Sequence, residues 1–162
     1  MNIKEGIEKR FSVRAFTDEV PSMDKIKEIL KMAGSAPSGG NIQPWKVYVL
    51  NKESKKKLAE KTLNNFDTGV QEEIEYEIYP KPLADEYKKR RYECGADMYE
   101  ALSIEKDDLD SRFKQIRENY NFFGAPLGMI ITIDRSFGSN GWGHVGMFLE
   151  NLWLSAIHHG LG

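Results

Sequence analysis

The chain has 162 residues, a formal net charge of -2 at pH 7 and a single cysteine, Cys94. A chain of this length is expected to form one domain with a core of its own, and one cysteine excludes an internal disulfide framework. The near-neutral charge does not indicate a nucleic-acid-binding protein, and no apolar run is long enough for a transmembrane helix. The first residues also lack a signal-peptide core, so we expect a single cytoplasmic domain over residues 1–162.

Two helices are predicted before residue 35. Asn2 suits the N-cap of a short helix that carries Ile3 and Ile7 on one face. Ser22 suits the N-cap of a second helix, which Gly34 ends. The apolar residues of this second helix recur at helical spacing, as Ile26, Ile29, Leu30 and Ala33. The segment RFSVRAF at 10–16, between the two helices, is expected to be extended or irregular.

The middle of the chain begins with a predicted strand and continues as a polar helical region. WKVYVL at 45–50 has the composition and length of a strand, and the lysine-rich stretch at about 53–64 predicts a solvated helix. Residues 66–121 are predicted to form a helical insertion or lid within the domain. Their apolar residues form two helical stripes: Leu83, Tyr87, Cys94, Met98, Ala101 and Leu102, then Leu109, Phe113, Ile116 and Tyr120.

The last part of the chain holds the clearest strand and the most apolar helix. LGMIITID at 127–134 predicts a strand, and residues 145–159 predict a helix that is apolar on nearly every side. Such a helix must be buried on all sides, so part of it is expected to face another subunit. Few strands and no regular alternation of strands and helices favour an α+β sandwich over a doubly wound sheet.

The segment at 10–16 carries Arg10, Ser12 and Arg14 at alternate positions, so an extended backbone would point them to one side. Two guanidiniums and a hydroxyl on one face suit a phosphate group, because arginine forms fork-shaped, charge-assisted hydrogen bonds to phosphate oxygens. Taken alone, the same residues are explained as well by a solvated basic edge that pairs with surface carboxylates.

The loop before the first strand combines small, polar and stiff residues. Gly39 and Gly40 allow the backbone to approach a flat ligand closely, and Ser38 and Asn41 offer hydrogen bonds to polar ring edges. Pro37 restricts the backbone of the loop. An ordinary turn between a helix and a strand is the alternative, since the same residue types are common in turns.

Several other kinds of site are not indicated. The chain has no phosphate-binding P-loop, no dinucleotide-binding glycine motif after a strand and no nucleophile elbow of a hydrolase. The three histidines, His144, His158 and His159, show no metal-ligand spacing with Cys94 or with one another, so no metal site is expected.

Taken together, the motifs resemble the FMN-dependent nitroreductase family. In chain order they are RFSVRAF, a helix, APSGGNIQPW before a strand, FFGAPLGMIITID and GHVGMFLENLWLSAIHHGLG. The stretch YPKPLADEYKKRRYECGADMYEALSI resembles the branch that includes nitroaromatic and nitrobenzoate reductases. The resemblance extends over nearly the whole chain and keeps the order of the motifs.

The resemblance implies a three-layer α/β/α sandwich with a mixed sheet, an intertwined homodimer, and FMN as the cofactor. By position in the motifs, Arg10, Ser12 and Arg14 would hold the phosphate and ribityl chain of FMN. The flavin ring would lie against the partner subunit's loop, which corresponds to Pro37, Ser38, Gly39, Gly40 and Asn41.

The resemblance also implies the chemistry, which the cofactor carries, so no side chain acts as a nucleophile. NAD(P)H would give a hydride to the flavin and leave, and a nitroaromatic or quinone would then be reduced at the same place in a ping-pong reaction. Tyr92, Phe122 and Phe123 are expected to face this oxidant, because lid segments of this kind often line pockets.

Members of the family continue beyond the position of Gly162. The continuation supplies a backbone N–H near flavin N5, further basic residues for the phosphate and a strand that reaches the partner's sheet. The 162-residue chain is therefore expected to hold FMN more weakly than a longer one. Two alternatives to an active nitroreductase stay open: a truncated flavin-binding member without activity, and a member with ene or dehalogenation chemistry on the same fold.

Overall fold

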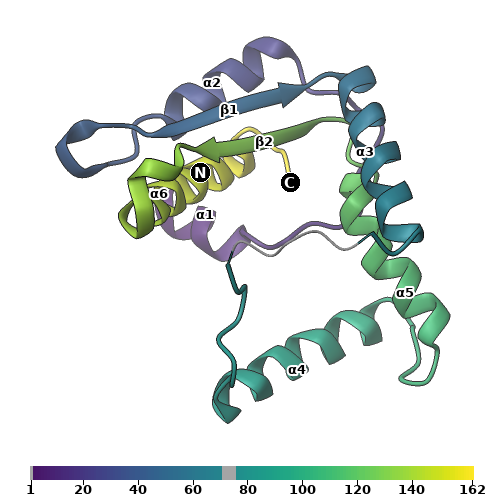
Figure 1. The fold of residues 1–162 in the computed structure, drawn as a ribbon. Helices are drawn as coiled ribbons and strands as arrows, with labels where there is room; N and C mark the ends of the chain where they lie inside the picture. The colour runs from purple at the N-terminus through teal and green to yellow at the C-terminus, as the bar shows by residue number, and fades with distance from the viewer. Residues whose placement is uncertain (1, 71–75) are drawn as a thin grey trace. The chain divides into compact units, whose positions relative to one another are not determined.

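The structure, a computed structural model, describes residues 2–70 and 76–162, which form two compact units. The first unit comprises residues 1–58 and 123–162, and the second comprises residues 59–122. Figure 1 shows the elements, which are α1 (Ile3–Lys9), α2 (Met23–Ala33), η1 (Gly39–Asn41), β1 (Trp45–Leu50), α3 (Lys52–Asp67), α4 (Asp85–Ala101), α5 (Leu109–Arg117), η2 (Glu118–Gly124), β2 (Gly128–Ile133), η3 (Arg135–Phe137) and α6 (Gly138–His158).

The two N-terminal helices begin where their capping residues predict. The side chain of Asn2 accepts a hydrogen bond from the Glu5 N–H at 2.9 Å, and the Glu5 carboxylate accepts one from the Asn2 N–H at 3.2 Å. This reciprocal pair satisfies two donors that the first turn leaves unpaired. Ser22 likewise caps α2 by accepting from the Lys25 N–H at 3.3 Å. Both predicted helix starts are confirmed.

In the first unit, β1 and β2 pair antiparallel although a long stretch of chain separates them. The register places Val47 opposite Ile131 and Tyr48 opposite Ile130. Because side chains alternate along a strand, Trp45 and Val47 point to one face of the sheet with their partners on β2. The side chain of Tyr48, on the other face, is 55% exposed.

One face of this strand pair carries the core. Trp45, Val47, Met129 and Ile131 pack against a buried cluster from α2, the following loop and α6. The cluster consists of Ile29, Ala33, Ala36, Phe148 and Leu152. Helices α2 and α6 pack on each other, and Figure 1 shows both running alongside the strand pair. The apolar spacing predicted for α2 therefore corresponds to its buried stripe.

Helix α6 starts earlier than its sequence predicts. It begins at Gly138 rather than near Val145, and the first residues of the helix, GSNGWGH, are poor helix formers. Within this additional part of the helix, Gly141 is buried against the side chains of Ile133 and Phe137. Within the single chain Trp153 is 47% exposed, so the chain alone does not bury the helix on all sides, and the expectation that part of it faces another subunit stays a prediction.

The lysine-rich helix is also less solvated than expected. The ammonium of Lys55 is part-buried and donates a hydrogen bond to the carbonyl oxygen of Ala125. Ala59, one turn further along α3, is buried. Neither contact has a signal in the local sequence, where lysines dominate the pattern.

The second unit is helical, as predicted for this region, but its two apolar stripes are only partly covered. Phe66 packs against Phe113 and Tyr120, with ring centroids 4.9 Å and 4.7 Å apart. Cys94 is exposed, and the side chain of Leu109 is 72% exposed. The helical periodicity was therefore a better guide to the elements than to burial.

An ion pair joins α3 to α5 inside the second unit. The guanidinium of Arg117 donates to both carboxylate oxygens of Asp67, each at 2.7 Å. This bidentate hydrogen bond holds the pKa of Asp67 below its ordinary value of 3.8.

The lowered pKa predicts a dependence of stability on pH. A carboxyl group with a depressed pKa in the folded state stabilises it above the unfolded pKa, and the contribution is lost as the pH falls through the folded pKa. Asp67→Asn should therefore be less stable than the unsubstituted chain at neutral pH, with a difference that shrinks below about pH 4. Urea unfolding of both chains from neutral pH to about pH 2 measures this, with the exposed Asp97→Asn as the control. A difference that is independent of pH would contradict the role of the charge.

These elements do not test the predicted sandwich, homodimer and domain division. In the described ranges the sheet has two antiparallel strands, and no helix there is both long and apolar enough to cross a membrane. The three-layer sandwich with a mixed sheet, the homodimer, and the single domain with an insertion at 66–121 stay predictions.

Candidate functional site

The basic segment lies between α1 and α2 as an extended stretch without regular structure, as predicted. The guanidinium of Arg10 lies over the ring of Trp153 on α6, 5.9 Å from its centroid. That of Arg14 lies over the ring of Phe123, 5.6 Å from its centroid, and donates to the carbonyl oxygen of Ser12 at 3.0 Å. The two arginines thus have different aromatic neighbours.

The described part of the chain gives neither arginine a carboxylate partner. The ion pairs there involve other residues, and the only hydrogen bond from these two guanidiniums is that of Arg14 to Ser12. Guanidiniums that stack on rings by their faces keep N–H donors at their edges. These contacts do not show the alternative, a basic edge that pairs with surface carboxylates. The N–H donors of the two guanidiniums suit a phosphate group.

The loop at 37–41 is held by hydrogen bonds of its own. The Asn41 N–H donates to the Ser38 carbonyl oxygen at 2.8 Å, and the Gln43 N–H donates to the Ser38 hydroxyl at 2.9 Å. Gly40 has a φ of 59°, in the left-handed region that glycine tolerates best. The hydroxyl of Ser38 thus stabilises the turn, and it keeps its own O–H to donate.

A contact with α6 anchors this loop. The Gly39 N–H donates to Nε2 of His144 at 3.1 Å, across 105 residues of sequence. A Cβ atom at position 39 would lie 3.4 Å from the same Nε2, about van der Waals contact, so the imidazole lies directly against this residue. Because Nε2 accepts, the neutral imidazole carries its proton on Nδ1, which is buried without a partner in the described residues. The sequence analysis missed His144, whose only signal is a polar residue in an apolar helix.

The remaining surface of the loop suits a flat ligand. Pro37, Gly39, Gly40 and Asn41 are exposed, and a Cβ atom at position 40 would meet nothing within 4 Å. The Gly40 N–H and the Asn41 side chain have no hydrogen-bond partner within the described part of the chain. A surface without bulk and with free donors fits the polar edge of an isoalloxazine ring.

No hydrogen bond in the described ranges joins Arg10 or Arg14 to residues 37–41. Hydrogen bonds among the described residues therefore do not link the two predicted parts of the site within one chain. This agrees with the expectation that the loop serves the flavin of the other subunit, which remains a prediction.

The three residues expected to face an oxidant have different surroundings. Tyr92 on α4 is 65% exposed, whereas Phe122 and Phe123 are half-buried in η2. Phe122 and Phe123 have φ values of 55° and 49°, which are unusual for bulky residues. Residues with such a backbone conformation are found more often at functional sites than elsewhere. Their role toward a substrate stays a prediction.

Loss of the His144 imidazole is expected to loosen the loop. His144→Ala removes the acceptor of the Gly39 N–H, so exchange of that amide with solvent should become about tenfold faster. Hydrogen exchange followed by NMR measures this, with His158→Ala on the same helix as the control. His144→Gln, which keeps an acceptor, should recover part of the protection. Equal exchange of Gly39 in all these chains would show that the imidazole does not anchor the loop.

No group of three potential metal ligands lies together among residues 2–70 and 76–162. His158 and His159 lie at the end of α6, where their rings pack edge to face.

Comparison with known proteins identifies the family. The model described as "Nitroreductase family" matches residues 7–162. A 4-nitrobenzoate reductase of Nocardioides sp. (strain LMS-CY) is 34% identical over 155 residues, which are 94% of this chain and 63% of that protein. A nitrobenzene nitroreductase of Ectopseudomonas oleovorans is 31% identical over 160 residues, which are 98% of this chain and 70% of that protein.

Solved structures agree. The FMN and NADPH-dependent nitroreductase NfnB from sphigopyxis sp. strain HMH matches with a TM-score of 0.92 and 34% identity, over 99% of this chain and 72% of that one. The NfnB of Mycobacterium smegmatis in complex with NADPH matches with a TM-score of 0.90 and 25% identity, over 97% of this chain and 70% of that one. The chain spans less than two thirds of the 4-nitrobenzoate reductase and about 70% of the other three proteins. The match over residues 7–162 confirms the prediction from the motifs: the chain belongs to the nitroreductase family.

Proposed function

We propose that this protein is an FMN-dependent oxidoreductase that uses NAD(P)H to reduce nitroaromatic or quinone-like acceptors. The observation that carries the proposal is the family match over residues 7–162. The relatives reported above are described as reductases of nitrobenzoate and nitrobenzene, and the solved structures as FMN- and NADPH-dependent.

FMN, when bound, supplies the hydride chemistry in two half-reactions, one with NAD(P)H and one with the acceptor. Arg10, Ser12 and Arg14 bind its phosphate and ribityl chain, since the two guanidiniums lack carboxylate partners in the described ranges. Their positive charge also favours the reduced, anionic form of the cofactor.

The loop orients the ring. In the partner subunit, the loop formed by Pro37, Ser38, Gly39, Gly40 and Asn41 would lie against the ring. The Gly40 N–H, the Ser38 hydroxyl and the Asn41 side chain would be the donors to its polar edge. His144 acts as a positioning residue, because its bond to Gly39 keeps this turn of the loop in place. No side chain of the protein needs to form a covalent bond to the substrate.

A homodimer in the cytoplasm completes the proposal. The support for a dimer is the apolar surface that α6 leaves exposed, where Trp142 and Trp153, on one side of the helix, are 54% and 47% exposed. Monomeric proteins rarely leave large apolar patches in contact with water, so a second copy is a suitable cover for this face. The support for the compartment is the exposed thiol of Cys94, which a reducing environment keeps free.

Absorption spectroscopy tests the function. We expect the purified chain to take up FMN and keep its visible absorption through desalting. Addition of NADH or NADPH without oxygen should bleach the flavin, and 4-nitrobenzoate should restore the colour. A chain that takes up no FMN on titration overturns the proposal, and a flavin that neither cofactor bleaches shows a binding protein without this activity.

A further inference from the structure

The second unit contains a cavity whose lining includes none of the residues proposed to bind FMN. It measures about 340 Å³ and lies between α4 and the residues around the start of α5. Four cationic side chains and two tyrosines line most of it: Lys88, Arg91, Lys106, Arg112, Tyr92 and Tyr99. No carboxylate is among these lining residues, although Glu100 and Glu105 line an adjoining hollow that shares Lys106 and Arg112.

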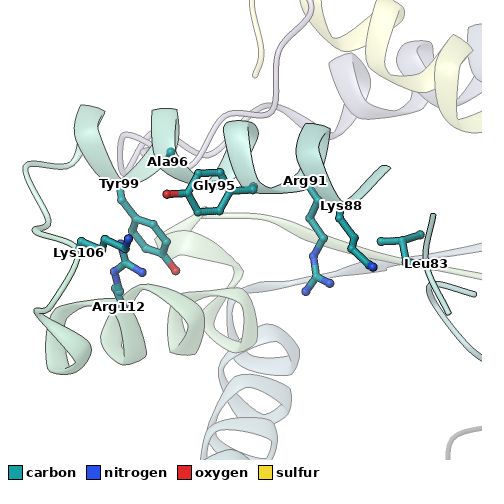
Figure 2. A pocket seen from close by; sticks show the side chains of 9 residues that line it. Leu83, Lys88, Arg91, Gly95, Ala96, Tyr99, Lys106 and Arg112 are labelled. Atoms are coloured by element: carbon teal, nitrogen blue, oxygen red, sulfur yellow. The ribbon is translucent and has the colours of Figure 1, made fainter. Parts of the chain in front are cut away.

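The positive charges gather at two ends of the cavity. Figure 2 shows Lys88 and Arg91 side by side on α4, while Lys106 and Arg112 approach Tyr99 at the other end. Lys88 pairs with Asp85 at 2.8 Å, but Asp85 is nearly fully exposed and does not line the cavity. Like charges that line one cavity repel one another, so an anion bound there would stabilise the folded unit.

Both arginines are oriented by aromatic rings. The guanidinium of Arg91 lies 4.6 Å from the ring centroid of Tyr79, and that of Arg112 lies 4.3 Å from the centroid of Tyr99. Arg112 also donates from Nε to the Glu105 carbonyl oxygen at 3.3 Å. Its two terminal nitrogens are thereby left to donate to a ligand. A guanidinium fixed by its face presents a preorganised fork of N–H donors, the geometry that binds phosphate.

The wall between the two charged ends suits a planar group. Gly95 and Ala96 of α4 line this part, and a Cβ atom at position 95 would meet nothing within 4 Å. Tyr92 and Tyr99 lie on the same helix beside this part of the wall. The ring of Tyr92 offers a surface for stacking, and that of Tyr99 already carries the Arg112 guanidinium over one face. A flat ring can therefore approach α4 closely while its charged substituents reach both ends.

We propose that this cavity binds a phosphorylated adenine nucleotide, with the base against Gly95 and the tyrosines and the phosphates at the two cationic ends. Two separated cationic ends favour a nucleotide with two separated phosphates over one with a single phosphate. The phosphorylated adenosine half of NADPH has this chemistry, and free nucleotides share part of it. The assignment to NADPH rests on the proposed function, whereas binding of the nucleotide itself needs no flavin and can be tested without it.

Calorimetric titration of the full chain with adenosine 2′,5′-bisphosphate tests the site. This probe carries no nicotinamide, so its binding is independent of any flavin reaction. We expect Arg91→Ala and Arg112→Ala each to weaken binding about tenfold, since each removes charge-assisted hydrogen bonds. We expect the monophosphate 5′-AMP to bind about tenfold more weakly than the bisphosphate for the same reason.

The neighbouring arginine provides the matched control. Arg90 carries the same charge on the same helix, but it pairs with Glu86 at 3.2 Å and does not line the cavity. Arg90→Ala should leave the affinity within about twofold, as expected for a screened surface charge. Arg91→Lys, which keeps the charge but not the fork, should fall between Arg91→Ala and the unsubstituted chain.

Thermal unfolding of each variant shows whether a loss of affinity is due to misfolding. If Arg91→Ala is misfolded, the affinity of Arg91→Lys tests the role of Arg91 instead. Absence of binding of the bisphosphate to the unsubstituted chain overturns the proposal. An equal loss in Arg90→Ala and Arg91→Ala overturns it as well, because it shows a non-specific response to net charge. Binding of 4-nitrobenzoate as tight as that of the bisphosphate also overturns it, in favour of a site for aromatic acids. A chain that binds FMN and fails these tests retains the proposed function without this site.

Discussion

Replacement of Phe148 by alanine is expected to lower the free energy of unfolding by about 3–5 kcal/mol. Phe148 is 1% exposed and belongs to the core cluster with Ile29 and Leu152. Its ring stacks on that of Trp45 with centroids 5.0 Å apart, so it joins α6 to β1. Truncation would remove this ring contact and leave a cavity that the packed helices cannot fill completely.

Urea unfolding followed by tryptophan fluorescence measures the change. The matched control is Phe11→Ala, because the side chain of Phe11 is 72% exposed and its loss should cost under about 1 kcal/mol. A similar cost at both positions would contradict the assignment of Phe148 to the core of the first unit.

Removal of both guanidiniums of the basic segment is expected to weaken FMN binding at least about a hundredfold. Charge-assisted hydrogen bonds are worth about 1.5–3 kcal/mol each, and every 1.4 kcal/mol corresponds to about a factor of ten in affinity. Arg10→Ala with Arg14→Ala removes both donors proposed for the phosphate. The single variants should each lose about tenfold.

Quenching of FMN fluorescence on binding gives these affinities. Lys27→Ala is a suitable control, because Lys27 is 71% exposed and pairs only weakly with Asp24 at 3.6 Å. Lys55 is a poor control, since its ammonium bonds to the Ala125 carbonyl oxygen. If the double variant bound FMN as well as Lys27→Ala does, the phosphate site would have to lie elsewhere.

Local features explain why many elements could be predicted from the sequence. A capping side chain such as that of Asn2 or Ser22 acts within one turn of its own helix. Strand β1 has the predicted bounds, Trp45–Leu50, because its β-branched and aromatic residues suit a pleated strand. The order of the motifs along the chain was also sufficient to identify the family.

Burial was harder to predict, because it depends on what lies opposite each side chain. The sequence of α6 is apolar all round, yet only one face meets α2 and the strands, and Trp153 is left exposed. Lys55 has the composition of a solvated residue but reaches a carbonyl 70 residues away. Hydropathy records the transfer cost of a residue and carries no information about its neighbours in space.

The sequence by itself determined the starts of α1 and α2, the two strands and the family. Only the tertiary structure decided that His144 anchors Gly39 across 105 residues. It also decided that Lys88, Arg91, Lys106 and Arg112 line one cavity without a carboxylate. Such sites arise from contacts between residues that are far apart in the chain or on different helices. These contacts follow from packing of the whole chain, because no local propensity or periodicity specifies which distant side chains will meet.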